Sequence, residues 1–269
     1  MPELPEVEVT RRAVAARFVG RRLSAVVVRN ARLRYPVPRA VRALAGERLL
    51  AVRRRGKYLL LGFARAHLIV HLGMSGSLRL VASRDPPGAH DHVDLVFGSR
   101  ALRLRDPRRF GALLCTSGPP EAHPLLRGLG AEPLAASFDG RTLYRLTRGR
   151  RATIKSLLMD ARTIAGLGNI YAAEALFRAG VRPTTRAARL SLARCERLAR
   201  AIRATLREAI RAGGSSLRDY AQPGGAPGEF QLRALVYRRA GEPCRRCGAT
   251  IRRSRHGART TYWCARCQR

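Results

Sequence analysis

Two spacings of apolar residues divide the chain. Up to about residue 116, short runs rich in valine, leucine and isoleucine are separated by glycine, proline and serine, a pattern typical of β-strands. Farther along, apolar residues recur every three or four positions, which is the period of an α-helix packed on one face. We therefore expect a β domain followed by a helical domain.

Five segments of the first half are candidate strands, at residues 23–29, 51–63, 66–80, 92–98 and 101–115. They predict a β-sandwich or barrel. A helix is expected before them, from about residue 5 to 19, because Val7, Val14 and Phe18 follow helical spacing and Gly20 supplies a stop. In the second half, helices are expected within residues 154–164, 170–180 and 191–214.

Two segments rich in glycine and proline interrupt these patterns. Residues 117–134 form the predicted linker between the two halves. Residues 213–229 predict a mobile loop that precedes a compact C-terminal tail.

The charge of the chain is strongly one-sided, with 53 basic and 18 acidic residues and a formal charge of +35. Such a charge attracts polyanions, of which nucleic acid is the commonest and an anionic membrane surface the alternative. The sequence has no secretory signal and no uncharged apolar run of about 18 residues. We therefore expect a cytosolic protein that does not enter membranes.

Lysine is rare, because Lys57 and Lys155 are the only two and every other basic residue is arginine. An arginine-favouring genome explains this bias as well as selection for phosphate-binding guanidinium groups does. The two lysines therefore mark positions that require a primary amine, or they are chance survivals.

The first ten residues, MPELPEVEVT, hold three glutamates and no basic side chain. Carboxylates near the start of a helix favour its dipole, which is the structural interpretation. The alternative is that carboxylates kept in so basic a chain take part in a reaction.

The C-terminal tail carries two pairs of cysteines, Cys244-x2-Cys247 and Cys264-x2-Cys267, at a spacing typical of one tetrahedral Zn2+. Two disulfides are the alternative, which a reducing cytosol disfavours. Four thiolates leave no open coordination position, so the zinc is expected to be structural. It would fasten a hairpin that displays Arg252, Arg253, Arg255 and Arg259.

A glycine turn, IAGLGNIYA, separates two of the predicted helices. Gly166 and Gly168 allow a tight turn, and Asn169 is expected to cap the helix that follows. Free N–H groups at such a helix start would bind a phosphate, and plain helix packing is the alternative.

Isolated cysteines and histidines have competing interpretations. Cys115 and Cys195 lie in apolar segments and are expected to be packed thiols rather than nucleophiles. The histidine pairs are His67 with His71 and His90 with His92. A second metal site is one interpretation of them, but phosphate contact or packing is favoured.

Eight motifs follow one another along nearly the whole chain. They are PELPEVE at 2–8, RRGKYLL at 54–60, HLGMSG at 71–76, HDHV at 90–93, DPRRFG at 106–111, LGAEPL at 129–134, AGLGNIYAAEALF at 165–177 and GEPC at 241–244. Together with the four cysteines, this ordered series resembles formamidopyrimidine-DNA glycosylases, which are bifunctional base-excision repair enzymes. No single motif is decisive, but their joint occurrence is highly specific.

The resemblance implies an α+β multidomain fold. Its parts would be an N-terminal catalytic β-sandwich domain with an N-terminal helix at 1–132, a helix-two-turn-helix DNA-binding domain at 133–228, and a four-cysteine zinc finger hairpin at 229–269. It also implies a monomer of the bacterial cytosol, associated with the nucleoid, that holds one structural Zn2+ and binds damaged double-stranded DNA. The implied reaction is removal of oxidised purines, 8-oxoguanine and formamidopyrimidines, followed by strand cleavage through β,δ-elimination.

The resemblance also explains the acidic start of the chain. In this family the initiator methionine is removed, so the Pro2 nitrogen would attack the sugar C1′ and form a Schiff base. Glu3 would act as an acid at the sugar ring oxygen, and Glu6 would be a buried supporting carboxylate. A free α-amine suits this role, because with a pKa near 7.7 about one in six is unprotonated at neutral pH.

Further residues match family positions that contact DNA near the lesion. Lys57 matches a lysine that reaches the lesion's phosphate and is counted as catalytic with Arg259, and Lys155 matches a supporting lysine. The remaining expected DNA contacts of this kind are His71, His90, Arg150 and Asn169.

A nucleotide turned out of the duplex leaves a hole that must be filled. By resemblance, Met74 would be an apolar insert, Arg108 would meet the orphaned cytosine, and Phe110 would stack into the helix. Composition alone would place this methionine and phenylalanine in a core.

Three positions depart from the common family pattern, namely Val9, Ala89 and Glu229. The last lies in the glycine-rich loop at 222–229, near the segment that covers the damaged base in relatives, so lesion preference is the open question. The alternatives are the related endonuclease VIII branch, which favours oxidised pyrimidines, and a zinc-ribbon protein that binds DNA without catalysis.

Overall fold

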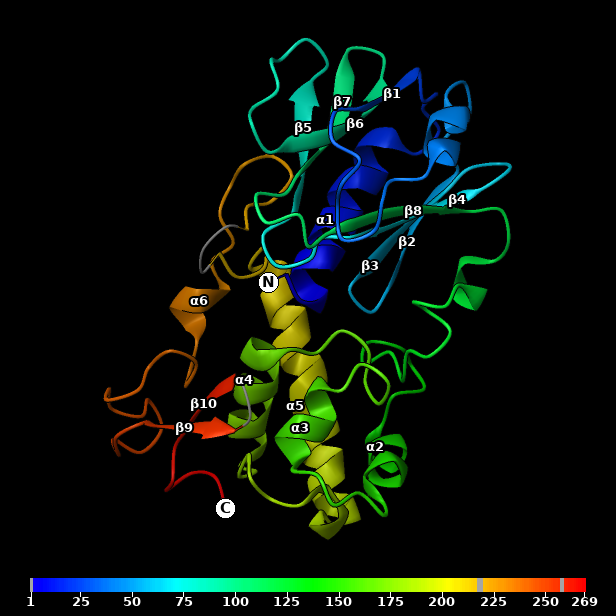
Figure 1. Cartoon of the computed structure of the whole chain (residues 1–269). Coiled ribbons are helices and arrows are strands. Elements are labelled where there is room, and N and C mark those ends of the chain that lie inside the picture. Colours follow the sequence, from blue (N-terminus) through cyan, green and yellow to red (C-terminus); the bar gives the residue numbers. More distant parts are fainter. Residues whose placement is uncertain (1, 217–219, 257–258) are drawn as a thin grey trace. The chain divides into compact units, whose positions relative to one another are not determined.

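The computed structural model describes residues 2–216, 220–256 and 259–269, and the chain divides into two compact units (Figure 1). One unit comprises Met1–Gly128 and Ala212–Glu229, and the other comprises Leu129–Arg211 and Phe230–Arg269. Each unit is thus built from two separate stretches of sequence. The division into three consecutive domains at residues 132 and 228 stays a prediction.

Two antiparallel four-stranded sheets form the first unit, ordered β1-β6-β7-β5 and β2-β3-β4-β8 (Figure 1). In chain order the strands are β1 (Ala25–Val28), β2 (Ala51–Arg55), β3 (Tyr58–Gly62), β4 (His67–His71), β5 (Ser77–Ala82), β6 (Asp91–Phe97), β7 (Arg100–Arg105) and β8 (Ala112–Thr116). Apolar residues of both sheets, among them Leu61, Leu68, Leu95 and Leu102, share one buried cluster. The expected β-sandwich is confirmed. Two short 3-10 helices, η1 (Arg39–Leu44) and η2 (Pro120–Ala122), complete the elements of this unit.

Helix α1 (Leu4–Phe18) lies within one residue of its predicted bounds. Pro5 falls in its first turn, where the missing N–H costs no hydrogen bond. Val7, Val14 and Phe18 are all buried in the cluster of the sheets, and the Phe18 ring stacks on Phe97 at 4.5 Å. The residues that predicted the helix therefore also attach it to the sandwich.

Glu8 has a structural role among the acids of α1. Its carboxylate accepts hydrogen bonds from Arg11 at 2.8 Å, Arg12 at 3.0 Å and Arg54 at 3.2 Å. Burial alone would raise the pKa of Glu8, but the bonds from Arg11 and Arg12 hold it below its usual range. This glutamate ties α1 to strand β2.

The second unit consists of helices and the C-terminal hairpin. Its elements are α2 (Gly140–Thr147), α3 (Ile154–Met159), α4 (Asn169–Ala179), η3 (Ala187–Arg189), α5 (Leu192–Arg211), α6 (Phe230–Arg233), β9 (Arg252–His256) and β10 (Arg259–Trp263). Helix α2 was not expected, although the Asp139 side chain caps it by accepting the Thr142 N–H at 2.7 Å. Within the described residues, no helix has the length and apolarity needed to cross a bilayer.

Glu174 of α4 holds the segment that leads into the hairpin region. Its fully buried carboxylate accepts the backbone N–H groups of Leu235 and Val236 at 2.9 Å and of Tyr237 at 2.8 Å. Burial raises the pKa of Glu174, and these three hydrogen bonds oppose that rise. A segment without regular structure is therefore fixed to α4 by one side chain.

Replacing this carboxylate should weaken the second unit. Glu174→Gln retains one acceptor oxygen but points an NH2 group at backbone donors, so we expect the free energy of unfolding to fall by about 2–3 kcal/mol in chemical denaturation. Glu242→Gln is the matched control, because the exposed Glu242 carboxylate is paired with Arg239 at the surface. Equal losses in the two variants would contradict the role of Glu174.

Candidate active site and metal centre

Pro2, Glu3 and Glu6 gather at the start of α1. Pro2 is buried and Glu3 is 3% exposed, with an extended backbone before the helix begins. The Glu3 N–H donates to Glu6 Oε2 at 2.7 Å, and Glu6 Oε1 accepts the N–H of Ser215 at 2.8 Å. The buried Glu6 carboxylate thus fixes the residue that follows Pro2. Met1 lies outside the described residues.

The segment that returns to the first unit packs directly on Glu6. The Tyr220 hydroxyl donates to the Glu6 carbonyl oxygen at 3.3 Å, and burial raises the pKa of Tyr220. Gly214 has a φ of +84°, and a Cβ there would lie 3.0 Å from the Glu6 carboxylate. Glycine at this position therefore allows both the turn and the close approach.

The glycine-rich loop makes a hydrogen-bonded turn where it is described. The Gln222 N–H donates to the Ala226 carbonyl at 2.9 Å, and the Leu80 N–H of strand β5 donates to the Pro223 carbonyl at 2.9 Å. The expectation of a mobile loop includes residues 217–219, which lie outside the described residues, and it stays a prediction.

Lys57 and His71 lie close together in the first unit. Lys57 occupies the turn between β2 and β3, and the Tyr58 ring, opposite His71 in the ladder, lies 4.8 Å from the imidazole. Burial, together with the charges of Lys57 and Arg34, lowers the pKa of His71 to about 4. Arg34 was not expected here from the sequence, and no motif singles it out.

The tautomer of His71 follows from one hydrogen bond. Its Nδ1 accepts the N–H of Gly73 at 3.0 Å, so the proton of the neutral ring is on Nε2. The site therefore combines an uncharged N–H donor with two cationic side chains, a set of groups suited to a phosphate.

Met74, Arg108 and Phe110 lie on two loops that touch. Met74 is 42% exposed and Phe110 is 45% exposed, so the expectation from composition, that they are core residues, is wrong. The Arg108 guanidinium lies 4.7 Å from the centre of the Phe110 ring. Large apolar side chains exposed this far are typical of a binding surface.

Histidines 90 and 92 differ in their surroundings. His90 is exposed, whereas His92 is buried and its Nε2 lies 2.8 Å from the Asp106 carbonyl oxygen. Asp106 was missed as a candidate, although the first position of DPRRFG was the available signal.

Lys155 and Asn169 both bind strand β10. Lys155 is 4% exposed, and its Nζ donates to Thr261 Oγ1 at 2.6 Å. Asn169 Nδ2 donates to the Thr260 carbonyl at 2.9 Å. The expectation that Asn169 caps α4 is wrong, because its side chain turns to the hairpin and Gly168 occupies the cap position.

A pocket of about 250 Å³ lies beside this contact. Lys155, Asp160, Arg259 and Thr261 are among the residues that line it, so the structure brings Lys155 and Arg259 together. Arg150 is exposed in the loop between α2 and α3 and does not line this pocket.

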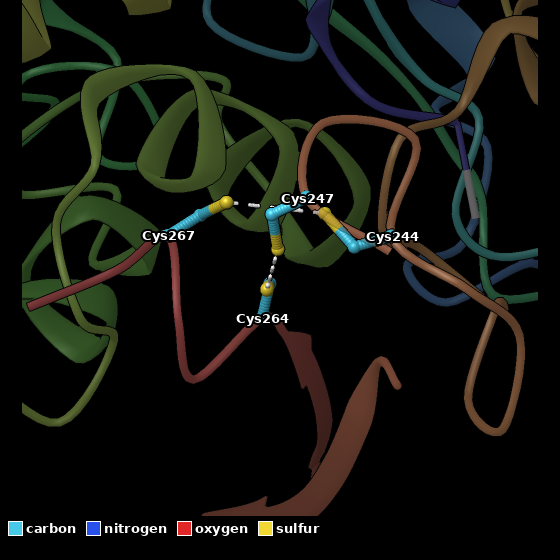
Figure 2. Close-up of side chains that lie close together, drawn as sticks. All are labelled: Cys244, Cys247, Cys264 and Cys267. Carbon is cyan, nitrogen blue, oxygen red and sulfur yellow. Dashed lines mark hydrogen bonds between the residues drawn. The ribbon is translucent and has the colours of Figure 1, made fainter. Parts of the chain in front are cut away.

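The four tail cysteines form one cluster, shown in Figure 2. Their sulfur atoms lie within 4.8 Å of one another, with 3.9 Å between Cys244 and Cys267 and 3.5 Å between Cys247 and Cys264. A tetrahedral Zn2+ with Zn–S distances of about 2.3 Å holds its sulfurs roughly 3.8 Å apart. The donor set and its geometry fit one structural zinc.

The thiols are reduced and chemically suited to a metal. The cysteines are free, which contradicts the alternative of two disulfides. The N–H of Ala249 lowers the pKa of the Cys247 thiol to about 7, which favours its thiolate form. Cys115 and Cys195 are packed thiols whose pKa values are raised by burial, as expected.

The chain matches the family models of three domains. Residues 1–113 match the formamidopyrimidine-DNA glycosylase N-terminal domain, residues 129–221 match the H2TH domain of that enzyme, and residues 241–269 match the zinc finger found in FPG and IleRS. Formamidopyrimidine-DNA glycosylases of Methylococcus capsulatus and Halorhodospira halophila are 56% and 55% identical to it over the full length of both chains.

Solved structures share the architecture. The Thermus thermophilus MutM (FPG) protein has a TM-score of 0.89 at 42% identity, covering 99% of this chain and 98% of its own. The Lactococcus lactis Fpg in complex with abasic-site DNA has a TM-score of 0.90 at 34% identity, covering 99% of each chain.

The buried, neutral His71 should make stability depend on pH. Its folded-state pKa of about 4 lies below the ordinary 6.5, so the unfolded chain binds the extra proton between these values. We expect the free energy of unfolding to fall as pH drops from 6.5 to 4, and less steeply in His71→Gln. An NMR titration of the His71 ring with a midpoint above pH 6 would contradict this account.

Loss of one thiolate should release the metal. We expect about one zinc per wild-type chain and almost none in Cys264→Ser, measured by elemental mass spectrometry. The fluorescence of Trp263, the sole tryptophan and a direct neighbour of Cys264, should shift in the same variant. Cys115→Ser serves as the control and should keep its zinc; equal zinc content in both variants would refute the assignment.

Proposed function

The chain belongs to the formamidopyrimidine-DNA glycosylase family and is a DNA glycosylase, and from this premise we propose that it removes oxidised purines from duplex DNA. The substrates would be 8-oxoguanine and formamidopyrimidines, and the abasic strand would then be cleaved. Solved relatives from Lactococcus lactis are complexes with DNA that contains Fapy-dG or an abasic site, which supports this choice. The observation that carries the proposal is the joining of Glu3, beside Pro2, to the buried Glu6.

The proposed nucleophile is the nitrogen of Pro2. Once Met1 is removed, this secondary amine attacks C1′, the glycosidic bond breaks, and the base leaves with the electron pair and a proton. The ring-opened sugar and the amine form an iminium, which acidifies the neighbouring protons. Successive β- and δ-eliminations then expel the phosphates on the two sides of the sugar. The removal of Met1 is required, because an acylated proline nitrogen is not nucleophilic.

The two glutamates would divide the remaining work. Glu3 is next to the amine and would protonate the sugar ring oxygen as C1′ is attacked. Glu6 has both oxygens engaged by backbone N–H groups, which suits a residue that holds the site rather than one that exchanges protons with substrate. The geometry thus favours the roles that the resemblance implies.

Phosphate contacts would come from both units. In the first unit, Lys57, Arg34 and the Nε2–H of His71 would bind phosphates beside the lesion. In the second, the pocket lined by Lys155 and Arg259 offers another basic site. Because Lys155 and Asn169 bind Thr261 and Thr260 at the beginning of β10, they would also set the position of Arg259.

The exposed trio Met74, Arg108 and Phe110 would fill the hole left by the everted nucleotide. Arg108, stacked on Phe110, would present its guanidinium edge to the orphaned cytosine. Zinc would be bound by Cys244, Cys247, Cys264 and Cys267 and would supply structure alone, because four thiolates leave no position for a substrate.

Borohydride trapping tests the proposal. The wild-type protein should be trapped on duplex DNA that holds 8-oxoguanine opposite cytosine, more than on a dihydrothymine duplex, with the adduct on Pro2 by mass analysis. Preference for dihydrothymine would move the enzyme to the endonuclease VIII branch. Absence of an adduct, with Pro2 free and DNA tightly bound, would leave a protein that only binds DNA.

Glu3→Gln separates binding from chemistry. It should bind the 8-oxoguanine duplex as the wild type does, while base release slows by at least about a hundredfold. Glu8→Gln is the matched control from the same helix and should excise at a near-normal rate, since Glu8 is engaged by arginines. Unchanged excision by Glu3→Gln would remove Glu3 from the mechanism.

A further inference from the structure

We propose that Asp106 is a positioning residue for base removal. Its buried carboxylate joins the loop that carries Met74 to the loop that carries Arg108 and Phe110, so that these three side chains enter the duplex as one preformed wedge. The inference rests on the proposed function, because the wedge belongs to it.

The carboxylate reaches one neighbour of each exposed apolar side chain. Asp106 is completely buried. Its Oδ1 accepts the hydroxyl of Ser75 at 2.7 Å, and its Oδ2 accepts the N–H of Gly111 at 2.7 Å. Ser75 follows Met74 in the chain and Gly111 follows Phe110, so a single side chain fixes the backbone beside both.

A second connection crosses the loops through Ser75. The Ser75 hydroxyl donates to Asp106 and accepts the Arg108 N–H at 3.3 Å. Asp106 itself is held by its backbone, because its N–H donates to the His90 carbonyl at 3.0 Å and its carbonyl accepts the Arg109 N–H at 3.2 Å. The backbone at or next to each of the three wedge residues is therefore linked to the Asp106 carboxylate, either directly or through Ser75.

The backbones of the two loops are in close contact. A Cβ on Gly73, whose φ is +60°, would lie 2.4 Å from the carbonyl carbon of Phe110. A Cβ on Gly111 would lie 2.9 Å from the His71 carbonyl oxygen and 3.0 Å from the Asp106 carboxylate. Only glycine fits at these contacts, so the backbones of the two loops pack directly against each other.

This rigidity matters because eversion of a stacked nucleotide costs a few kcal/mol. Side chains on loose loops would have to be ordered at the same moment, and that loss of entropy would add to the barrier. Asp106 is too deeply buried to touch DNA, so its effect must pass through Met74, Arg108 and Phe110.

The test uses Asp106→Asn in the full-length protein. An amide offers one acceptor oxygen, so the bond to Ser75 or the bond to Gly111 is weakened. We expect two rates to slow by at least about tenfold. One is the rate of eversion, monitored by the fluorescence of a 2-aminopurine placed beside the lesion, and the other is the single-turnover excision of 8-oxoguanine. Cleavage of a duplex with a preformed abasic site, which has no base to turn out, should stay within about threefold of wild type. Preference for cytosine opposite the lesion should also weaken, because Arg108 would meet that base.

Two further variants complete the test. Ser75→Ala removes both bonds of the Ser75 hydroxyl, to Asp106 and from the Arg108 N–H, and should also lower the ratio of excision to abasic-site cleavage. This keeps the test open if Asp106→Asn fails to fold. Asp85→Asn is the control, because this exposed carboxylate accepts the Ala82 N–H at 2.9 Å away from the wedge, and it should change nothing.

The outcomes separate this inference from the proposed function. A wild-type protein that neither excises 8-oxoguanine nor cleaves abasic DNA would overturn both. With an active wild type, an unchanged ratio of the two rates in Asp106→Asn and Ser75→Ala, or an equal loss of both rates, would overturn the positioning role alone.

Discussion

Buried carboxylates that each accept several hydrogen bonds hold the irregular segments of this protein in place. Glu6 fixes the residue after Pro2, Asp106 joins two loops, and Glu174 binds three consecutive N–H groups. A carboxylate is the natural hub for such segments, because it offers two acceptor oxygens with several lone pairs and its bonds are charge-assisted. The chain has only 18 acidic residues, and these three are buried in the interior.

The basic residues are arranged in the opposite way. They are mostly exposed. Of the two buried ones among the described residues, Arg103 is paired with Asp94 at 2.9 Å, and Lys155 donates to the Thr261 hydroxyl. Around His71, by contrast, Lys57 and Arg34 act together with burial to keep the imidazole uncharged. The result is a surface that attracts polyanions in general, with a small number of neutral donors at defined places.

The spacing of apolar residues predicted α1 and the strands well. In α1, for example, Val7, Val14 and Phe18 all pack into the buried cluster of the sheets. The spacing missed α2, which is only 8 residues long and buries just Gly140, Leu143 and Thr147, so its clearest signal was the cap at Asp139. The role expected of Asn169 failed because a distant strand, β10, competes for its amide. The motif DPRRFG marked Asp106 but not its role, since its partner Ser75 lies 31 positions away in the sequence and is brought to it by the fold. The cysteine cluster was predictable because spacing alone sets its chemistry.

The first unit contains a stretch, Ala212–Glu229, that the ribosome makes long after the sandwich. Its Ser215 N–H and Tyr220 hydroxyl are partners of Glu6, so the setting of the amino terminus is incomplete while only the first half of the chain has emerged. Domains generally fold in the order of their synthesis. Here the N-terminal residues depend on a stretch that is made much later, so a nascent or truncated chain without it lacks two of the partners that fix Glu6.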